Sequence, residues 1–147
     1  MVRFEPAPSR RPLFGQLLWF LGWLGLTGVA AYLHPNPHLH GTHTQLGLPP
    51  CLSVVLFGRP CPGCGMTTSI TSLVHGHIVD AFRAHPFGPP MYLVYTLSAF
   101  AAAWAWWKVR RMDAGSRAAN TFLVCLLIAF IAFGIIRFAT TSGLTWY

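Results

Sequence analysis

The densest chemical feature of the chain is a pair of cysteines in the string Cys61-Pro62-Gly63-Cys64. Two thiols at this spacing can close a small disulfide ring, and they can equally hold one metal ion from adjacent corners of a tetrahedron. A redox pair requires a partner thiol, disulfide or quinone. A proline-glycine turn can also carry two cysteines simply as a structural staple. The motif leaves these three interpretations open.

Side chains that could complete a metal site lie near this pair in the sequence. A structural zinc site usually takes further ligands, and Cys51 and His75 are available beside Cys61 and Cys64. We take these four residues as candidate ligands of Zn or Cu, with Cys61 and Cys64 as the redox candidates. More histidines precede Cys51 in a proline-rich stretch, and we interpret them as hydrogen-bonding groups of an ordered loop: His34, His38, His40 and His43.

The segment after Cys64 must position these groups. Its pattern predicts a helix over residues 66–82, in which one face carries a polar stripe in line with Cys64. This cysteine then lies at the helix N-terminus, where free N–H groups and the helix dipole favour a thiolate. We therefore expect the thiolate form to be favoured at Cys64. The other residues of this face are Thr68, Thr71, Ser72, His75 and Arg83.

The composition indicates a protein that lies in a membrane. Of the 147 residues, 54% are hydrophobic and only 9% are charged, whereas soluble domains carry about 25% charged residues. So few charges cannot cover a soluble particle, and lipid must therefore cover much of it. The formal net charge of +7 fits anionic lipid headgroups, and no nucleic-acid-binding module is visible. The expected partners are the lipid bilayer and other membrane proteins, with no nucleic acid.

Three apolar stretches are long enough to cross the roughly 30 Å hydrocarbon core of a bilayer as helices. They cover residues 13–33, 90–107 and 118–136. The first is longer than the apolar core of a signal peptide, so we expect it to be retained. The predicted fold is therefore all-α, a polytopic membrane protein with three transmembrane helices.

A single membrane domain is expected over residues 1–147. Between the first two spans, residues 34–87 are expected to form an outer Cys/His loop and a short helix. Residues 46–58 within that stretch are apolar but too short to cross, which predicts a re-entrant or interfacial segment.

The distribution of basic residues predicts the orientation. Arginines precede the first span, and a basic cluster separates the second span from the third. The positive-inside rule places both in the cytoplasm and the Cys-Pro-Gly-Cys loop on the outer side. In the third span, Arg137 is expected to snorkel to the lipid headgroups, with pairing in the site as the alternative. Cys125 is expected to be a buried packing residue.

A longer pattern surrounds the cysteine pair: Cys61-Pro62-Gly63-Cys64-Gly65-Met66-Thr67, then His75-Gly76, Ala81-Phe82 and Pro86. From about Cys51 to the end of the second span, the chain resembles the small bacterial membrane proteins of domain-of-unknown-function family 2752. The resemblance implies a multi-pass protein of the bacterial inner membrane and no established activity. Two positions depart from the family: Thr68 replaces the usual Arg, and His85 replaces the usual Asn. Losing that Arg removes a fixed positive charge near Cys64, which His85 can replace only when protonated.

Three functions therefore compete. The first is an accessory or scaffold subunit of a membrane assembly, which the small size of the chain favours. A glycine face on the first span also favours it, because Gly22, Gly25 and Gly28 would let another helix approach. The second is a thiol–disulfide redox membrane protein that uses Cys61 and Cys64, with Cys51 as a further candidate. The third is a Zn- or Cu-binding membrane module. No other catalytic constellation is visible, so enzyme status stays open, with the non-enzymatic interpretation ahead.

Overall fold

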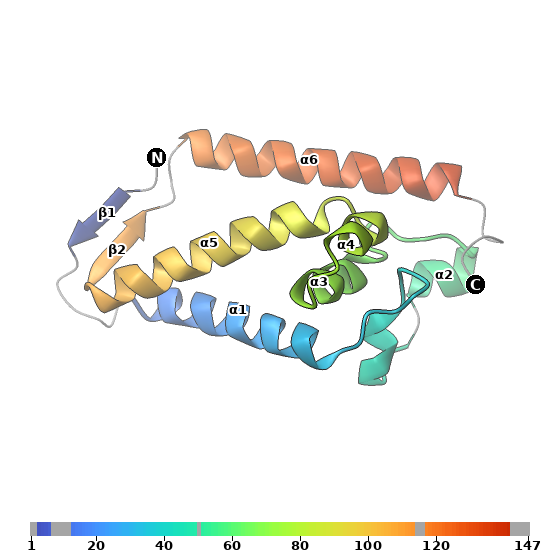
Figure 1. The fold of residues 1–147 in the computed structure, drawn as a ribbon. Coiled ribbons are helices and arrows are strands. Elements are labelled where there is room, and N and C mark those ends of the chain that lie inside the picture. The colour runs from blue at the N-terminus through green and yellow to red at the C-terminus, as the bar shows by residue number, and fades with distance from the viewer. Residues whose placement is uncertain (1–2, 7–12, 50, 114–116, 142–147) are drawn as a thin grey trace. The chain divides into compact units, whose positions relative to one another are not determined.

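The structure is a computed structural model that describes residues 3–6, 13–49, 51–113 and 117–141. Helices dominate this part of the chain (Figure 1), which confirms the predicted helical class. A short two-stranded ladder, which was not predicted, accompanies them. In chain order the elements are β1 (Arg3–Pro6), α1 (Phe14–Tyr32), the 3₁₀ helix η2 (Thr42–Leu46), α2 (Leu52–Phe57), α3 (Met66–Val74), α4 (Ile78–Ala84), α5 (Gly88–Trp107), β2 (Arg110–Asp113) and α6 (Arg117–Thr140).

The chain forms two compact units, each built from two separate stretches. The first unit combines residues 1–28 with residues 93–126, and the second combines residues 29–92 with residues 127–147. The cysteines of the predicted site lie in the second unit. The expectation of one domain over the whole chain stays a prediction.

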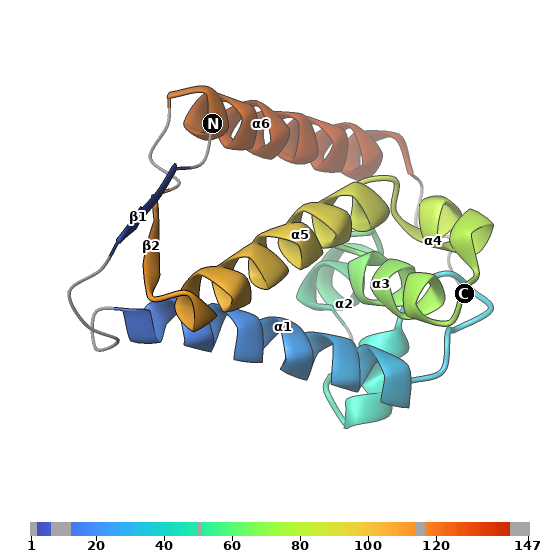
Figure 2. The same cartoon turned by 60° about the vertical axis from the view of Figure 1, so that its left-hand side comes forward.

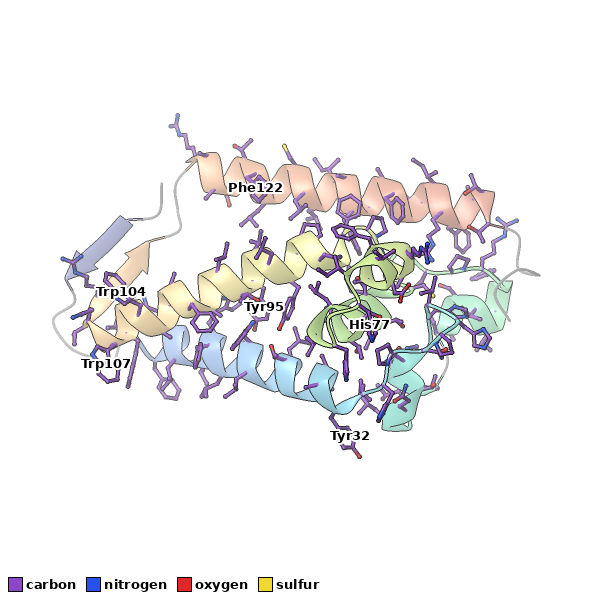
Figure 3. All side chains as sticks on the ribbon, in the orientation of Figure 1. Tyr32, His77, Tyr95, Trp104, Trp107 and Phe122 are labelled. Atoms are coloured by element: carbon purple, nitrogen blue, oxygen red, sulfur yellow. The ribbon has the colours of Figure 1, made fainter. Side chains whose placement is uncertain are left out.

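In the first unit, polar side chains join α1 to α5. Trp19 Nε1 donates to Ser98 Oγ at 3.0 Å, and Trp23 Nε1 donates to Thr96 Oγ1 at 2.9 Å. Tyr95 points from α5 toward α1 (Figure 3), where its hydroxyl donates to the Trp19 carbonyl at 3.3 Å. Such bonds between helices satisfy polar groups in surroundings that offer no water.

The glycine face of α1 is occupied at one position. A Cβ atom at Gly22 would lie 3.0 Å from the Tyr95 hydroxyl oxygen, so the glycine lets this side chain approach. At Gly25 and Gly28, no atom of the described residues lies within 4 Å of the corresponding position. A side chain of α5 thus approaches the face at Gly22, the rest of the face is open, and the close approach of another helix stays a prediction.

The strands β1 and β2 pair antiparallel in the first unit. Arg3 lies opposite Asp113, and Pro6 lies opposite Arg110. The ladder joins the segment before α1 to the connection between α5 and α6.

Within the described residues, two helices are long and apolar enough to cross a membrane, α1 and α6. Only 6% of the apolar 18-residue stretch of each helix is buried within the chain, whereas a core helix of a soluble protein is mostly buried. Cys125 on α6 is also exposed, so its expected burial was wrong. The predicted second span, over residues 90–107, was wrong as well. A helix does form there as α5, but its proline, tyrosine and tryptophan residues lower its mean hydropathy.

In the second unit, α3 and α4 form a short helical hairpin (Figure 2). The predicted continuous helix over residues 66–82 was wrong, because the chain breaks at Gly76. This glycine adopts the left-handed conformation (φ 83°) that side chains disfavour. The His77 N–H donates to the Ser72 carbonyl at 2.8 Å and closes the end of α3. Arg83, expected on the polar face, lies instead on α4 and forms an exposed ion pair.

Candidate thiol site

Helix α2 brings Cys51 and Cys61 together. Cys51 precedes the helix as its N-cap, with non-helical backbone angles (φ −54°, ψ 131°). Gly58 ends the helix in the left-handed conformation (φ 60°), and its N–H donates to the Val54 carbonyl at 2.9 Å. The chain then turns back and brings the Cys61 side chain beside Cys51. The sequence had indicated Cys51 as a further metal ligand and as a further candidate for the thiol–disulfide site.

The Cys-Pro-Gly-Cys string forms a tight turn. The Cys64 N–H donates to the Cys61 carbonyl at 2.9 Å, which closes a β-turn. Gly65 follows in the left-handed conformation (φ 88°) as the N-cap of α3. A Cβ atom at Gly65 would lie 2.5 Å from the Ala84 carbonyl oxygen. Only glycine therefore fits between the turn and the end of α4.

The C-terminal part of α6 also fixes this turn. A Cβ atom at Gly134 would lie 2.3 Å from the Cβ atom of Pro62, so a glycine lets α6 touch the turn. Arg137 Nη1 donates to the Cys64 carbonyl at 2.9 Å. The alternative of pairing in the site is therefore confirmed for Arg137, and its snorkelling to the headgroups stays a prediction. The positive charge that is missing at Thr68 is supplied here by α6.

A buried histidine makes a further contact with the turn. His85 is 0% exposed and lies among the rings of Phe87, Phe130 and Phe133, at centroid distances of 6.2, 5.5 and 5.4 Å. The Phe87 N–H donates to Nδ1 of His85 at 3.3 Å. The other nitrogen of a neutral imidazole then carries the hydrogen. Nε2 of His85 therefore donates to the Pro62 carbonyl at 3.0 Å.

The hydrogen bond between Cys51 and Cys61 separates their acidities. Burial by itself would raise the pKa of Cys51, but hydrogen bonds from the Cys61 thiol, Ser53 and the Val54 backbone lower that pKa below 9.0. Burial is the first cause that raises the pKa of Cys61 to about 11, followed by the hydrogen bond to Cys51 and the negative charge of its thiolate. Of the two thiols, Cys51 therefore has the lower pKa and Cys61 the higher.

Cys64 is not the thiolate that its place before α3 suggested. Burial raises the pKa of Cys64 above 9.0, the positive charge of Arg137 acts against this, and the charge on Cys51 adds to it. The expectation was wrong because burial outweighs both the nearby guanidinium and the start of the helix.

The polar stripe of α3 is buried. Its Thr68 Oγ1 shares a hydrogen bond of 2.8 Å with Thr42 Oγ1 of η2. Ser69, which the sequence did not single out, donates to the Ala81 carbonyl at 2.7 Å. These hydroxyls join α3 to η2 and α4 and so support the turn that precedes α3. The predicted stripe residues are each at most 1% exposed: Thr68, Thr71 and Ser72.

The histidine candidates for metal binding have other surroundings. His75 caps the end of α3, is exposed, and bonds through Nδ1 to the Thr71 carbonyl at 2.9 Å. In the part of the chain that the structure describes, no three His, Cys, Asp or Glu side chains form a group that could hold a metal ion. Zn or Cu binding by His75 with Cys51, Cys61 and Cys64 stays a prediction.

The two bonded thiols, the turn and the helical hairpin fall within one stretch that a known family describes. The family model for a protein of unknown function, DUF2752, matches residues 51–99. This stretch is similar to DUF2752. The match confirms the resemblance inferred from the Cys-Pro-Gly-Cys string and its surroundings. Comparison with curated proteins and with solved structures finds no match.

Two groups that fix the turn, Gly134 and Arg137, come from α6 and so lie outside the stretch that matches DUF2752. Gly134 was not predicted at the site, Arg137 was predicted there only as the alternative to snorkelling, and His85 only as a replacement charge when protonated. Arg137 carried a signal, because an ionised side chain in an otherwise apolar helix marks a functional contact. For Gly134, the sequence offered no signal beyond the presence of a glycine in an apolar run.

The pKa of His85 predicts an acid-sensitive fold. Burial is the main cause that lowers this pKa below 6.5, and the Arg137 charge adds to it, while the Pro62 carbonyl acts in the opposite direction. The unfolded chain therefore binds a proton that the folded chain rejects, and the stability due to neutral His85 is full above about pH 6.5 and lost below it. His85 is thus neutral at pH 7 and cannot supply the positive charge expected of its protonated form.

We expect the thermal midpoint of the purified protein in detergent to fall as the pH drops from 7 to 5. In His85→Asn, which cannot take up this proton, the midpoint should depend less on pH. Equal acid dependence in both proteins would contradict the assignment of a neutral His85.

Proposed function

We propose that this chain is a membrane-bound thiol–disulfide exchange protein. The observation that carries the proposal is that the Cys61 side chain lies beside Cys51, where the pKa of Cys51 is lowered and that of Cys61 is raised. This difference in pKa suits a dithiol, because one sulfur must attack a disulfide and the other must then resolve the mixed product. Contacts from α4 and α6 with Gly65 and Pro62 hold the turn that carries the second thiol.

The exchange takes two steps. The Cys51 thiolate attacks one sulfur of a partner disulfide, forms a mixed disulfide and releases the other partner sulfur as a thiolate. The Cys61 thiol gives its proton to that thiolate, and its sulfur then attacks Cys51 Sγ and releases the second partner thiolate. The Cys51 thiolate and the Cys61 thiol are oxidised to one disulfide, and the partner disulfide is reduced to one thiol and one thiolate.

The bilayer is the proposed surrounding of α1 and α6, because both helices are apolar and bury only 6% of their apolar stretch within the chain. The β1–β2 ladder joins the N-terminal segment to the basic connection before α6, which suits a common cytoplasmic side for both. The thiol site then lies on the outer side of a bacterial inner membrane, the side on which disulfides persist.

The pair of substitutions Cys61→Ala and Cys61→Ser tests the proposed function. A serine hydroxyl still donates to the Cys51 thiolate, whereas an alanine methyl group cannot. In a Cys125→Ser background, we expect alanine to raise the pKa of Cys51 and serine to leave it lowered. Peptide mass spectrometry of Cys51 alkylation at a series of pH values measures this pKa. The same pKa of Cys51 in both variants would show that Cys61 does not lower it, and the proposal would lose its support.

A second candidate is an accessory subunit of a membrane assembly. The open space at Gly25 and Gly28, within the described residues, favours it because a partner helix could approach α1 closely there. Under this candidate the thiols serve only to staple the turn, and the chain would co-purify with other membrane proteins even after both Cys51 and Cys61 are replaced.

A further inference from the structure

Helix α2 presents an apolar face beside the dithiol. Leu52, Val55 and Leu56 are 70%, 63% and 63% exposed. Because they are three and four residues apart, they share one face of the helix. Cys51 directly precedes this helix, so the thiolate lies at the edge of an exposed apolar surface.

The same helix is attached to the end of α6. The ring of Phe57 meets the ring of Phe138 edge-on, with the centroids 6.1 Å apart. Arg59 lies over the Phe138 ring at 5.6 Å and donates to the Phe138 carbonyl at 3.3 Å. Since α6 is apolar, exposed and long enough to cross a membrane, its end lies where acyl chains meet headgroups. A short apolar helix at that depth rests in the lipid interface, so we assign the bilayer to the exposed face of α2.

We propose that the electron acceptor of the Cys51–Cys61 dithiol is a lipid-soluble quinone, which reaches Cys51 from the bilayer along α2. The inference rests on the proposed thiol–disulfide function and names its oxidant. A sulfur–sulfur bond forms between Cys51 and Cys61, and the thiolate–thiol pair gives up two electrons and the proton of Cys61. The quinone takes up both electrons, this proton and a second proton from water, and becomes a quinol.

The chemistry around Cys51 suits this class of acceptor. Residues 46–60 carry a single charged side chain, Arg59, and its guanidinium is engaged with Phe138. A soluble protein partner is normally held through a polar rim of hydrogen bonds and charges. An apolar, planar ring that is dissolved in the lipid needs only the aliphatic and aromatic side chains that α2 offers.

The full-length protein in phospholipid vesicles, in a Cys125→Ser background and without oxygen, provides the test. After reduction and removal of the reductant, decylubiquinone is added in one sample and oxidised glutathione in another. We expect both to oxidise the protein, and the quinone sample to yield one quinol for each Cys51–Cys61 disulfide. The loss of quinone absorbance measures the quinol formed. Peptide mass spectrometry identifies the disulfide and distinguishes it from a covalent quinone adduct.

Two matched substitutions test whether the quinone reaches Cys51 along α2. Val55 on α2 and Val79 on α4 are each 63% exposed, so Val55→Asn and Val79→Asn remove the same apolar surface at two places. We expect Val55→Asn to slow oxidation by the quinone about tenfold without changing oxidation by glutathione, and Val79→Asn to change neither rate.

Three outcomes would overturn the quinone route. Oxidation by glutathione but not by the quinone would exclude this acceptor and leave the thiol–disulfide function standing. Equal slowing of both oxidants in Val55→Asn would show that α2 only positions the dithiol. A failure of both oxidants on the unaltered dithiol would contradict the proposed function itself.

Discussion

Replacing Cys51 by serine is expected to remove the fast-reacting thiol of the second unit. In the intact site, the pKa of Cys51 is lowered below 9.0, whereas a thiol such as Cys61, with a pKa of about 11, is ionised in about one molecule in 10⁴ at pH 7. The variant frees Cys61 from the neighbouring thiolate, but burial, the main cause of its raised pKa, persists. We therefore expect alkylation of the pair at pH 7 to slow by about 10- to 100-fold.

Cys61→Ser is the matched control for this result. It removes one thiol from the same pair but keeps a hydroxyl that can donate to Cys51, so the fast reaction should persist. Both variants are compared in a Cys125→Ser background, because Cys125 is exposed on α6. A Cys51→Ser protein that keeps the fast reaction would show that another thiol is the nucleophile.

Gly65→Ala is expected to cause the largest loss of stability among single methyl additions in the turn. The left-handed backbone at Gly65 (φ 88°) costs an alanine about 1–2 kcal/mol. The added Cβ would also lie 2.5 Å from the Ala84 carbonyl and 3.1 Å from the Leu39 carbonyl, which adds about 1–3 kcal/mol for overpacking. We expect the free energy of unfolding to fall by about 2–5 kcal/mol.

Gly76→Ala separates the two causes of this loss. Gly76 adopts a similar left-handed conformation (φ 83°), but no atom of the described residues lies within 4 Å of its Cβ position. The substitution should therefore cost only the backbone strain, about 1–2 kcal/mol. Denaturation of both variants in the same detergent measures the difference. Equal losses at the two glycines would mean that the turn does not press against α4.

Much of the helical framework could be predicted from the sequence, because length and apolar composition decide where long helices form. The predicted stretches over residues 13–33, 90–107 and 118–136 all correspond to helices, α1, α5 and α6. The break at Gly76 could not be predicted, since an isolated glycine is tolerated inside a helix pattern. The β1–β2 ladder pairs segments far apart in the chain, and nothing local indicates such a pairing.

The site was predicted in its parts but not in its arrangement. Spacing singled out Cys61 and Cys64, and helical periodicity predicted the polar stripe that the structure buries. The thiol that lies beside Cys61 is instead Cys51, and burial together with this neighbour, rather than the start of a helix, shifts their pKa values. Spacing along the chain carries no information about burial, which raises the pKa of Cys64.

The central claim is that Cys51 and Cys61 form a reversible disulfide, and equilibrium with glutathione tests it most directly. The Cys125→Ser protein in vesicles is equilibrated with a series of ratios of reduced to oxidised glutathione, quenched with acid, alkylated and digested. We expect a Cys51–Cys61 disulfide whose amount follows the ratio, with Cys64 alkylated throughout. A disulfide between Cys61 and Cys64, or thiols that stay reduced at every ratio, would contradict the pairing of Cys51 with Cys61.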